Sequence, residues 1–202
     1  MLEEEYEKTR RRLPRHLRRR PAEESFSFRI RRAEVTDIPD VREIYNHYVA
    51  NSVVTFDERK WTLARWREKF DHLQKLGLPF LVAISPGGQM LGYALVQPWA
   101  GKSAYRYTVE DSIYLGPGAT GKGLGKALLA ALVAACEEKG IREIVAVISD
   151  KGAEGSIALH ERAGFVEVGR MGRVGFKFGR WLGTVYLQKS LTPRRRGLFR
   201  RA

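Results

Sequence analysis

Residues 108–149 read TVEDSIYLGPGATGKGLGKALLAALVAACEEKGIREIVAVIS, and the order of patterns in this segment indicates the class of fold. Residues 108–115 have the composition of a strand, and a loop with five glycines follows it. Leucines recur at helical spacing over residues 124–139, and residues 144–148 form an unbroken apolar run typical of a central, parallel strand. Strand, glycine loop, helix and buried strand together predict a βαβ unit in an α/β domain.

The segments on either side of this unit predict further strands and helices. Phe26, Phe28 and Ile30 alternate with polar residues, which is the period of a half-buried strand. Thr36-Asp37-Ile38-Pro39 provides a capping residue, with Pro in the first turn of a helix. The other expected elements are a helix over about 63–76, strands over 80–84 and 91–96, a short helix over 156–162, and strands over 165–171 and 181–188.

The glycine loop matches two nucleotide-binding motifs only in part. Gly116 and Gly121 fit the dinucleotide fingerprint, but Asp150, the candidate ribose-binding acid, comes 29 residues after Gly121 instead of about 20. A P-loop requires Ser or Thr at the position of Gly123, because that hydroxyl holds magnesium. A tight turn that needs positive φ would explain one or two of these glycines easily, but it explains all five only poorly.

The register Gly121-Lys122-Gly123-Leu124-Gly125-Lys126 suits a pyrophosphate better. Glycines allow close approach of the backbone to a ligand, and the loop opens onto a helix N-terminus with unpaired N–H groups. Lys122 and Lys126 add positive charge, so this reading requires no metal.

From Phe28 to Leu191 the chain resembles the GCN5-related N-acetyltransferases (GNAT), and within them the branch that acetylates phosphinothricin and methionine sulfoximine. Thr120-Gly121-Lys122-Gly123-Leu124-Gly125 is similar to the acetyl-CoA pyrophosphate motif of that family. Four further segments, in the expected order, resemble markers of the branch: residues 44–49, 104–112, 156–165 and 175–181. The resemblance implies a GNAT fold, with a mixed and centrally splayed β-sheet flanked by helices.

The resemblance also implies how acetyl-CoA is held. In the family the pantetheine arm lies in the gap between the fourth strand and the next parallel strand. That assigns the pantetheine to the backbone of Ile113, Tyr114 and Leu115 and the pyrophosphate to residues 121–126, with Ser156 as a further cofactor contact. Two departures from the family pattern are Thr120, where Gln or Arg is frequent, and Ala153, where an Asn often contacts the cofactor.

The family pattern places two residues near the reacting groups. Glu110 aligns with the acid beside the substrate amine, and we expect it to be the general base, directly or through water. His160 aligns with a residue near the sulfur of CoA, as a general acid or as a group that orients the acetyl. Strand alternation puts Asp111 on the face opposite to Glu110, so the two carboxylates cannot both serve.

Substrate recognition is the part of the site where the family pattern is least complete. The branch carries basic residues after Pro98-Trp99 that can recognise an amino-acid carboxylate, and here Lys102 alone keeps a charge in that loop. We therefore expect Lys102, Arg106 and Glu110 to bind the substrate. The alternatives are acetylation of a protein N-terminus or another amine, or a non-catalytic module that binds the cofactor or nucleic acid.

Composition restricts the remaining possibilities. The chain has 202 residues, which is the length of one domain with extensions or at most two small domains. Its single Cys136 excludes an internal disulfide framework. We expect a basic extension over 1–25, an acetyltransferase domain over 26–191 and a basic tail over 192–202. Most of the net charge of +13 comes from arginine runs in the extensions, which favours non-specific contacts with polyanions. We expect a cytoplasmic enzyme without a membrane segment, and a homodimer stays open.

Overall fold

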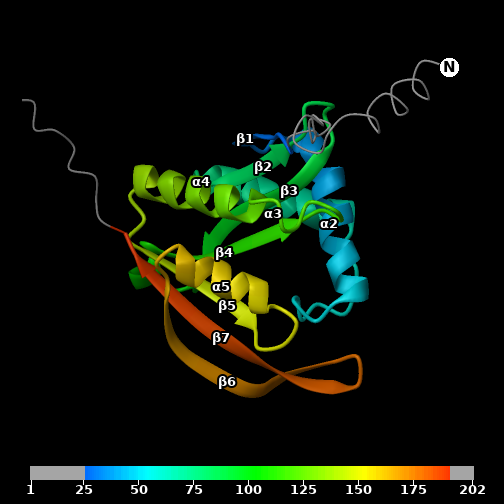
Figure 1. Ribbon diagram of the computed structural model, residues 1–202. Helices are drawn as coiled ribbons and strands as arrows, with labels where there is room; N and C mark the ends of the chain where they lie inside the picture. The colour runs from blue at the N-terminus through cyan, green and yellow to red at the C-terminus, as the bar shows by residue number, and fades with distance from the viewer. Residues whose placement is uncertain (1–25, 192–202) are drawn as a thin grey trace, which may run out of the picture.

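The computed structural model of the chain describes residues 26–191, which form one sheet covered by helices (Figure 1). The predicted basic segments 1–25 and 192–202 lie outside the described residues. The seven strands are β1 (Arg29–Arg32), β2 (Phe80–Ile84), β3 (Met90–Pro98), β4 (Thr108–Leu115), β5 (Glu143–Ser149), β6 (Val166–Lys177) and β7 (Arg180–Ser190). Their order in the sheet is β1-β2-β3-β4-β5-β7-β6. The β4–β5 pair is parallel and the other pairs are antiparallel, so the expected mixed sheet is confirmed.

Helices cover both faces of the sheet. They are α2 (Ile38–Asn51), α3 (Leu63–Leu76), α4 (Leu124–Lys139) and α5 (Glu154–Arg162), with single 3₁₀ turns η2 (Val35–Asp37) and η3 (Ser103–Tyr105). The ring of Tyr114 on β4 contacts Tyr45 and Tyr48 of α2, whereas Asp111 faces α5. Because side chains alternate along a strand, α2 and α5 lie on opposite faces of β4. Within residues 26–191 no helix has both the length and the hydropathy needed to span a membrane.

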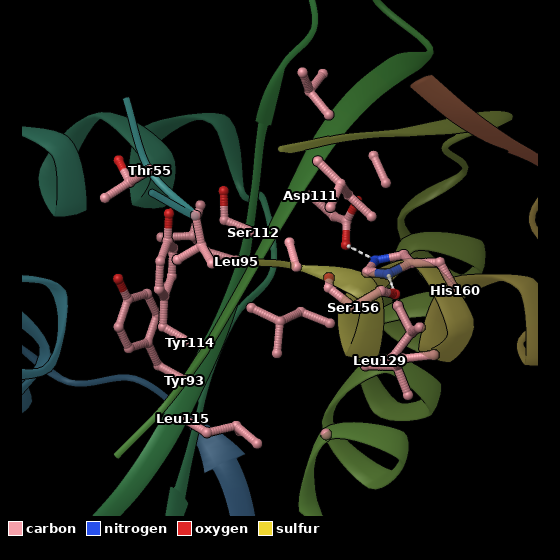
Figure 2. Close-up of a pocket in the computed structure, with 18 of the residues that line it drawn as sticks. Thr55, Tyr93, Leu95, Asp111, Ser112, Tyr114, Leu115, Leu129, Ser156 and His160 are labelled. Carbon is pink, nitrogen blue, oxygen red and sulfur yellow. Dashed lines mark hydrogen bonds and ion pairs between the residues drawn. The ribbon is translucent and has the colours of Figure 1, made fainter. Parts of the chain in front are cut away.

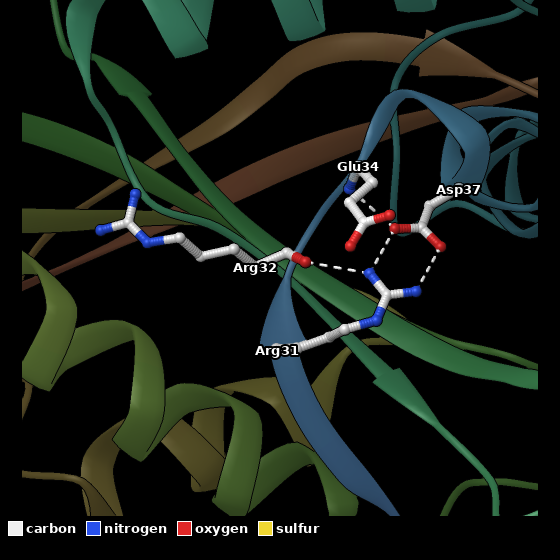
Figure 3. A network of polar contacts seen from close by, with 4 residues as sticks. All are labelled: Arg31, Arg32, Glu34 and Asp37. Carbon is white, nitrogen blue, oxygen red and sulfur yellow. Dashed lines mark hydrogen bonds and ion pairs between the residues drawn. The ribbon is translucent and has the colours of Figure 1, made fainter.

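The helix ends follow the expected signals, with one difference. Thr62 accepts a hydrogen bond from the Arg65 backbone N–H at 3.2 Å and caps α3. In the segment expected to cap the next helix, Asp37 directly precedes α2, but its side chain does not cap that helix. Instead Arg31 of β1 donates to both carboxylate oxygens of Asp37 at 2.6 and 2.8 Å, and the Glu34 N–H donates at 2.8 Å (Figure 3). This cluster ties the first strand to the start of α2.

The centre of the sheet opens between β4 and β5. Only Thr108, Val109 and Glu110 of β4 pair with β5, although β4 continues to Leu115. The rest of β4 keeps its pairing with β3 on the other side. The predicted central splay is therefore confirmed, and Figure 1 shows the two strands diverging.

The last hairpin is longer than the sequence predicted. We expected a strand ending at Met171, but β6 continues to Lys177 and turns directly into β7 through Phe178 and Gly179. The pairing of β6 with β7 shifts register twice, between Glu167 and Gly169 and between Met171 and Gly175. Such irregularities interrupt the alternation from which a strand is recognised, and β6 is an edge strand exposed over most of its length.

Candidate active site

A cavity of about 1710 Å³ occupies the gap where β4 and β5 diverge. Its lining comes from the glycine loop, β4, α4, β5 and α5 at one end, and from α2, α3 and β3 at the other. Figure 2 shows β4 crossing the cavity, with Tyr93 and Tyr114 on one side and Asp111, His160 and Ser156 on the other.

The glycine loop forms the first end of this cavity. Gly121, Gly123, Gly125 and Lys126 line it, as does Thr120. Gly123 has φ +80° and precedes α4 without any side chain capping the helix, so the first-turn N–H groups are left for a ligand. Leu124 is fully buried and anchors the helix in the core. Lys122 points elsewhere: its ammonium lies 4.9 Å from the Phe26 ring and borders a second cavity of about 740 Å³.

The open part of β4 contributes the next portion of the wall. Ile113, Tyr114 and Leu115 all line the cavity and have no partner on β5. The Leu115 carbonyl accepts a hydrogen bond from the Tyr48 hydroxyl at 2.8 Å, which fixes the end of the strand against α2. The sequence predicted the pantetheine at this segment. The segment suits an extended ligand because it has no strand partner on β5.

His160 lies on α5 and is bound at both ring nitrogens. Nε2 lies 2.9 Å from Asp111 Oδ2, and Nδ1 lies 2.8 Å from the Ser156 carbonyl oxygen. A carbonyl can only accept, so Nδ1 carries hydrogen, and a second proton is shared between Nε2 and Asp111. Burial acts to lower the pKa of His160, but the hydrogen bond and charge of Asp111 outweigh it and leave that pKa raised. His160 is 3% exposed and has no ring nitrogen left for a thiolate.

Glu110 lies on the other face of β4, as alternation predicts. It is half-buried and lines the cavity beside Lys69 and Gln97. Burial raises the pKa of its carboxyl, while a hydrogen bond from Gln97 and the charge of Lys69 partly oppose that effect. A carboxylate with a raised pKa that still faces a cavity is a suitable proton acceptor.

An aromatic cluster forms the far wall beyond Glu110. Tyr114 stacks on Tyr93 with centroids 5.5 Å apart, and Tyr45 packs edge-on against Tyr114 at 5.3 Å. The Asp57 carboxylate accepts hydrogen bonds from the Tyr45 hydroxyl and the Trp61 indole, which fixes the loop between α2 and α3. The wall is apolar in bulk but carries several hydroxyl and N–H groups.

The two cations expected to bind substrate are not brought to this cavity. Lys102 and Arg106 are exposed around η3 and do not contribute to its lining. The Arg106 guanidinium lies over the Tyr107 ring at 4.7 Å. The short turn presents both side chains to solvent, and their assignment to the substrate stays a prediction.

Lys69 of α3 lines the end of the cavity that α2, α3 and β3 form, and sequence reasoning missed it. The sequence signal for Lys69 was its position among the apolar residues of α3, of which Trp66, Phe70 and Leu73 are buried. The pairing of Asp111 with His160 was also missed, because 49 residues separate them. Within the described residues, no three His, Cys, Asp or Glu side chains gather as a metal site would require.

Comparison with known proteins gives consistent results. Residues 41–165 match the acetyltransferase (GNAT) family. The phosphinothricin N-acetyltransferase of Alcaligenes faecalis is 41% identical over 155 residues, covering 77% of this chain and 78% of that protein. The L-methionine sulfoximine/L-methionine sulfone acetyltransferase of Pseudomonas aeruginosa is 41% identical over 166 residues, covering 82% and 96%.

A solved structure is similar over nearly the same range. The crystal structure of a GNAT superfamily phosphinothricin acetyltransferase from Sinorhizobium meliloti, in complex with AcCoA, has a TM-score of 0.78 and 40% identity. The match covers 86% of this chain and 96% of that one.

Proposed function

The chain belongs to the acetyltransferase (GNAT) family and is an acetyl-CoA-dependent N-acetyltransferase, and from this premise we propose that its acceptor is an amino-acid-like amine. Phosphinothricin and methionine sulfoximine are the acceptors that the names of its relatives indicate. The observation that carries the proposal is 41% identity to two relatives over 155 and 166 residues, which is 77% and 82% of this chain.

We propose that the donor end holds acetyl-CoA, which supplies the acetyl group as a thioester. The uncapped first turn of α4 supports a pyrophosphate site at residues 121–126, and the open edge of β4 supports pantetheine contacts along Ile113–Leu115. Ser156 lines the same end of the cavity. For Lys122 the support is weaker, because its side chain borders the second cavity.

Glu110 is assigned as the proton acceptor of the reaction. An ammonium must lose a proton before its nitrogen can attack a thioester, and Glu110 faces the cavity where β4 leaves β5. Its raised pKa brings the carboxylate closer to the pKa range in which a general base is effective near neutral pH.

We assign His160 to positioning; of the two roles expected from sequence, general acid or a group that orients the acetyl, this assignment leaves out the general acid. Both ring nitrogens are bound inside the protein, and the side chain is buried. In this role the imidazole connects α5 to β4 across the donor end of the cavity. The leaving thiolate would then take its proton from another source.

The remaining assignments concern the whole chain. We keep residues 26–191 as the acetyltransferase domain and 1–25 and 192–202 as basic extensions that contact polyanions non-specifically. A homodimer is supported by exposed apolar side chains on the last hairpin, among them Val166, Phe176 and Trp181. Sedimentation analysis tests the dimer. A cytoplasmic location also stays part of the proposal.

An amine panel tests the proposed function. Thiol release from acetyl-CoA is followed with phosphinothricin, methionine sulfoximine, common amino acids and a peptide with a free N-terminus. We expect the highest kcat/KM with one of the amino-acid-like acceptors. Preference for the peptide would instead favour acetylation of a protein N-terminus, and no turnover with any amine, despite acetyl-CoA binding, would reject catalysis.

A further inference from the structure

The tip of the β6–β7 hairpin contacts the loop between α2 and α3, two segments that lie far apart in the sequence. Lys177, the last residue of β6, donates a hydrogen bond from its ammonium to the Thr55 carbonyl at 2.9 Å. Gly175 lies so close to Phe56 that an added Cβ would be 2.5 Å from the ring. Because alternate residues of a strand face the same side, Gly175 and Lys177 both meet the loop, and Phe176 between them is exposed.

Lys177 is buried at this contact, being 2% exposed. Within residues 26–191 no carboxylate comes within 4.0 Å of its ammonium, which bonds to the Thr55 carbonyl and lies 5.0 Å from the Phe178 ring centroid. Burial lowers the pKa of this ammonium, and the charges of Asp57 and Glu58 partly oppose the effect. Burying an ammonium costs free energy that an apolar anchor of the hairpin would not cost, so the bond to Thr55 itself requires an explanation.

The loop that Lys177 holds is part of the cavity wall. Thr55, Phe56 and Asp57 line the end of the cavity that α2, α3 and β3 form, and Figure 2 shows Thr55 on the same side of β4 as Tyr114. The Thr55 hydroxyl lies 3.1 Å from the Tyr45 hydroxyl, which also donates to the Asp57 carboxylate. These bonds hold residues 55–57 from the side of α2, and the hairpin holds them from the other side.

We propose that Lys177 is a positioning residue of the reaction, which through the Thr55 carbonyl holds residues 55–57 as a wall for the acceptor amine. The inference rests on the proposed function, because it takes the acceptor to enter the end of the cavity formed by α2, α3 and β3. Lys177 does not itself line the cavity, so it acts through the loop. Its loss should therefore weaken acceptor binding and leave the proposed acetyl-CoA site at the glycine loop intact.

Lys177→Met tests the hydrogen bond, because it removes the donor and keeps a side chain of similar length. With the best acceptor of the amine panel, KM for the amine should rise by about 5- to 50-fold, since a hydrogen bond from a charged group is lost. The dissociation constant of acetyl-CoA, measured by calorimetry, should hardly change. Arg180→Met, at an exposed basic residue that begins β7 after the same turn, is the matched control and should change neither value.

Gly175→Ala disturbs the same loop through the second contact. The added Cβ would overlap the Phe56 ring, so KM for the amine should rise by about 3- to 10-fold. Gly169→Ala is its control, because it lies in the same strand with no atom within 4 Å of an added Cβ. If Lys177→Met does not fold, the difference between these two glycine variants decides the question.

All variants are assayed well below their unfolding midpoints, so that a loss of stability alone does not alter KM. An unchanged KM for the amine in folded Lys177→Met would overturn the inference, and so would equal KM values in the two glycine variants. An equal loss of acetyl-CoA affinity would also overturn it, because a general weakening of the fold acts on both substrates. A wild-type chain that acetylates no amine would instead reject the proposed function, and this inference with it.

Discussion

Glu110 and Asp111 are consecutive carboxylates on β4, yet the two faces of the strand use them differently. Asp111 is 6% exposed and is held by His160, so its charge is compensated inside the protein. Glu110 is half-buried beside Gln97 and Lys69 and remains open to the cavity. The difference teaches that a carboxylate paired with a buried imidazole stabilises the fold, whereas one left facing a cavity can exchange a proton with a ligand.

The largest effect is expected from a substitution in the glycine loop between β4 and α4. Gly123→Asp should abolish acetyl-CoA binding in calorimetry, because it adds a negative charge at the first turn of α4 and a side chain at φ +80°.

Gly140→Asp is the matched control for the backbone strain. Gly140 ends the same helix at φ +85°, also with no atom within 4 Å of an added Cβ. Equal loss of binding in both variants would mean that strain in α4, and not the charge at the pyrophosphate, is responsible.

Glu110→Gln tests the open face of β4. It keeps the shape of the side chain but removes the proton acceptor, so turnover should fall by about 10² to 10⁴ while acetyl-CoA affinity hardly changes. The deficit should shrink at high pH, where more of the amine is already unprotonated. Full turnover in Glu110→Gln combined with loss in Asp111→Asn would show that the two faces were assigned the wrong way round.

Asp111→Asn tests the closed face. The amide can still accept from His160 but brings no charge, so we expect a loss of about 1–3 kcal/mol in the free energy of unfolding, measured in urea. Turnover of the folded variant should stay within about tenfold of the wild type, since Asp111 contacts no reacting group. A large loss of turnover at unchanged stability would give the pair a direct part in catalysis.

The pH dependence of stability sharpens the same contrast. His160 has a raised pKa in the folded chain, so its stabilising contribution is complete below the ordinary histidine pKa of about 6.5. That contribution is lost as the pH rises through the higher folded value. The midpoint of urea unfolding should therefore decrease across this window in the wild type, and less so in Asp111→Asn. An identical pH profile in both proteins would contradict the pairing.

The smallest effect is expected from removing the extensions, because no residue assigned to either face of β4 lies in them. A chain lacking residues 1–25 and 193–202 should keep turnover within about twofold, because every residue assigned to the cavity lies between 45 and 189. It should bind heparin less tightly, since those segments hold most of the excess positive charge. Lost turnover in a folded truncation would place the extensions in the site.

The sequence was sufficient for most elements, and most residues that it assigned to the cofactor line the cavity. The predicted bounds of α3, β2, β4 and α4 are confirmed, because each rests on a local period and on local end signals. The bounds of β6 were too short, because its register shifts hide the alternation. Of the residues expected to bind substrate, Glu110 lines the cavity and Lys102 and Arg106 do not.

By itself the sequence determined the βαβ unit, the position of the glycine loop and the opposite faces of Glu110 and Asp111. These features depend on the spacing of residues along one segment. In a helix or strand that spacing fixes the direction in which each side chain points. Only the tertiary structure decided that Asp111 meets His160 and that Lys69 reaches Gln97 beside Glu110. Those contacts join separate helices and strands, and which side chains meet there depends on how the elements pack across the sheet, which no local period encodes.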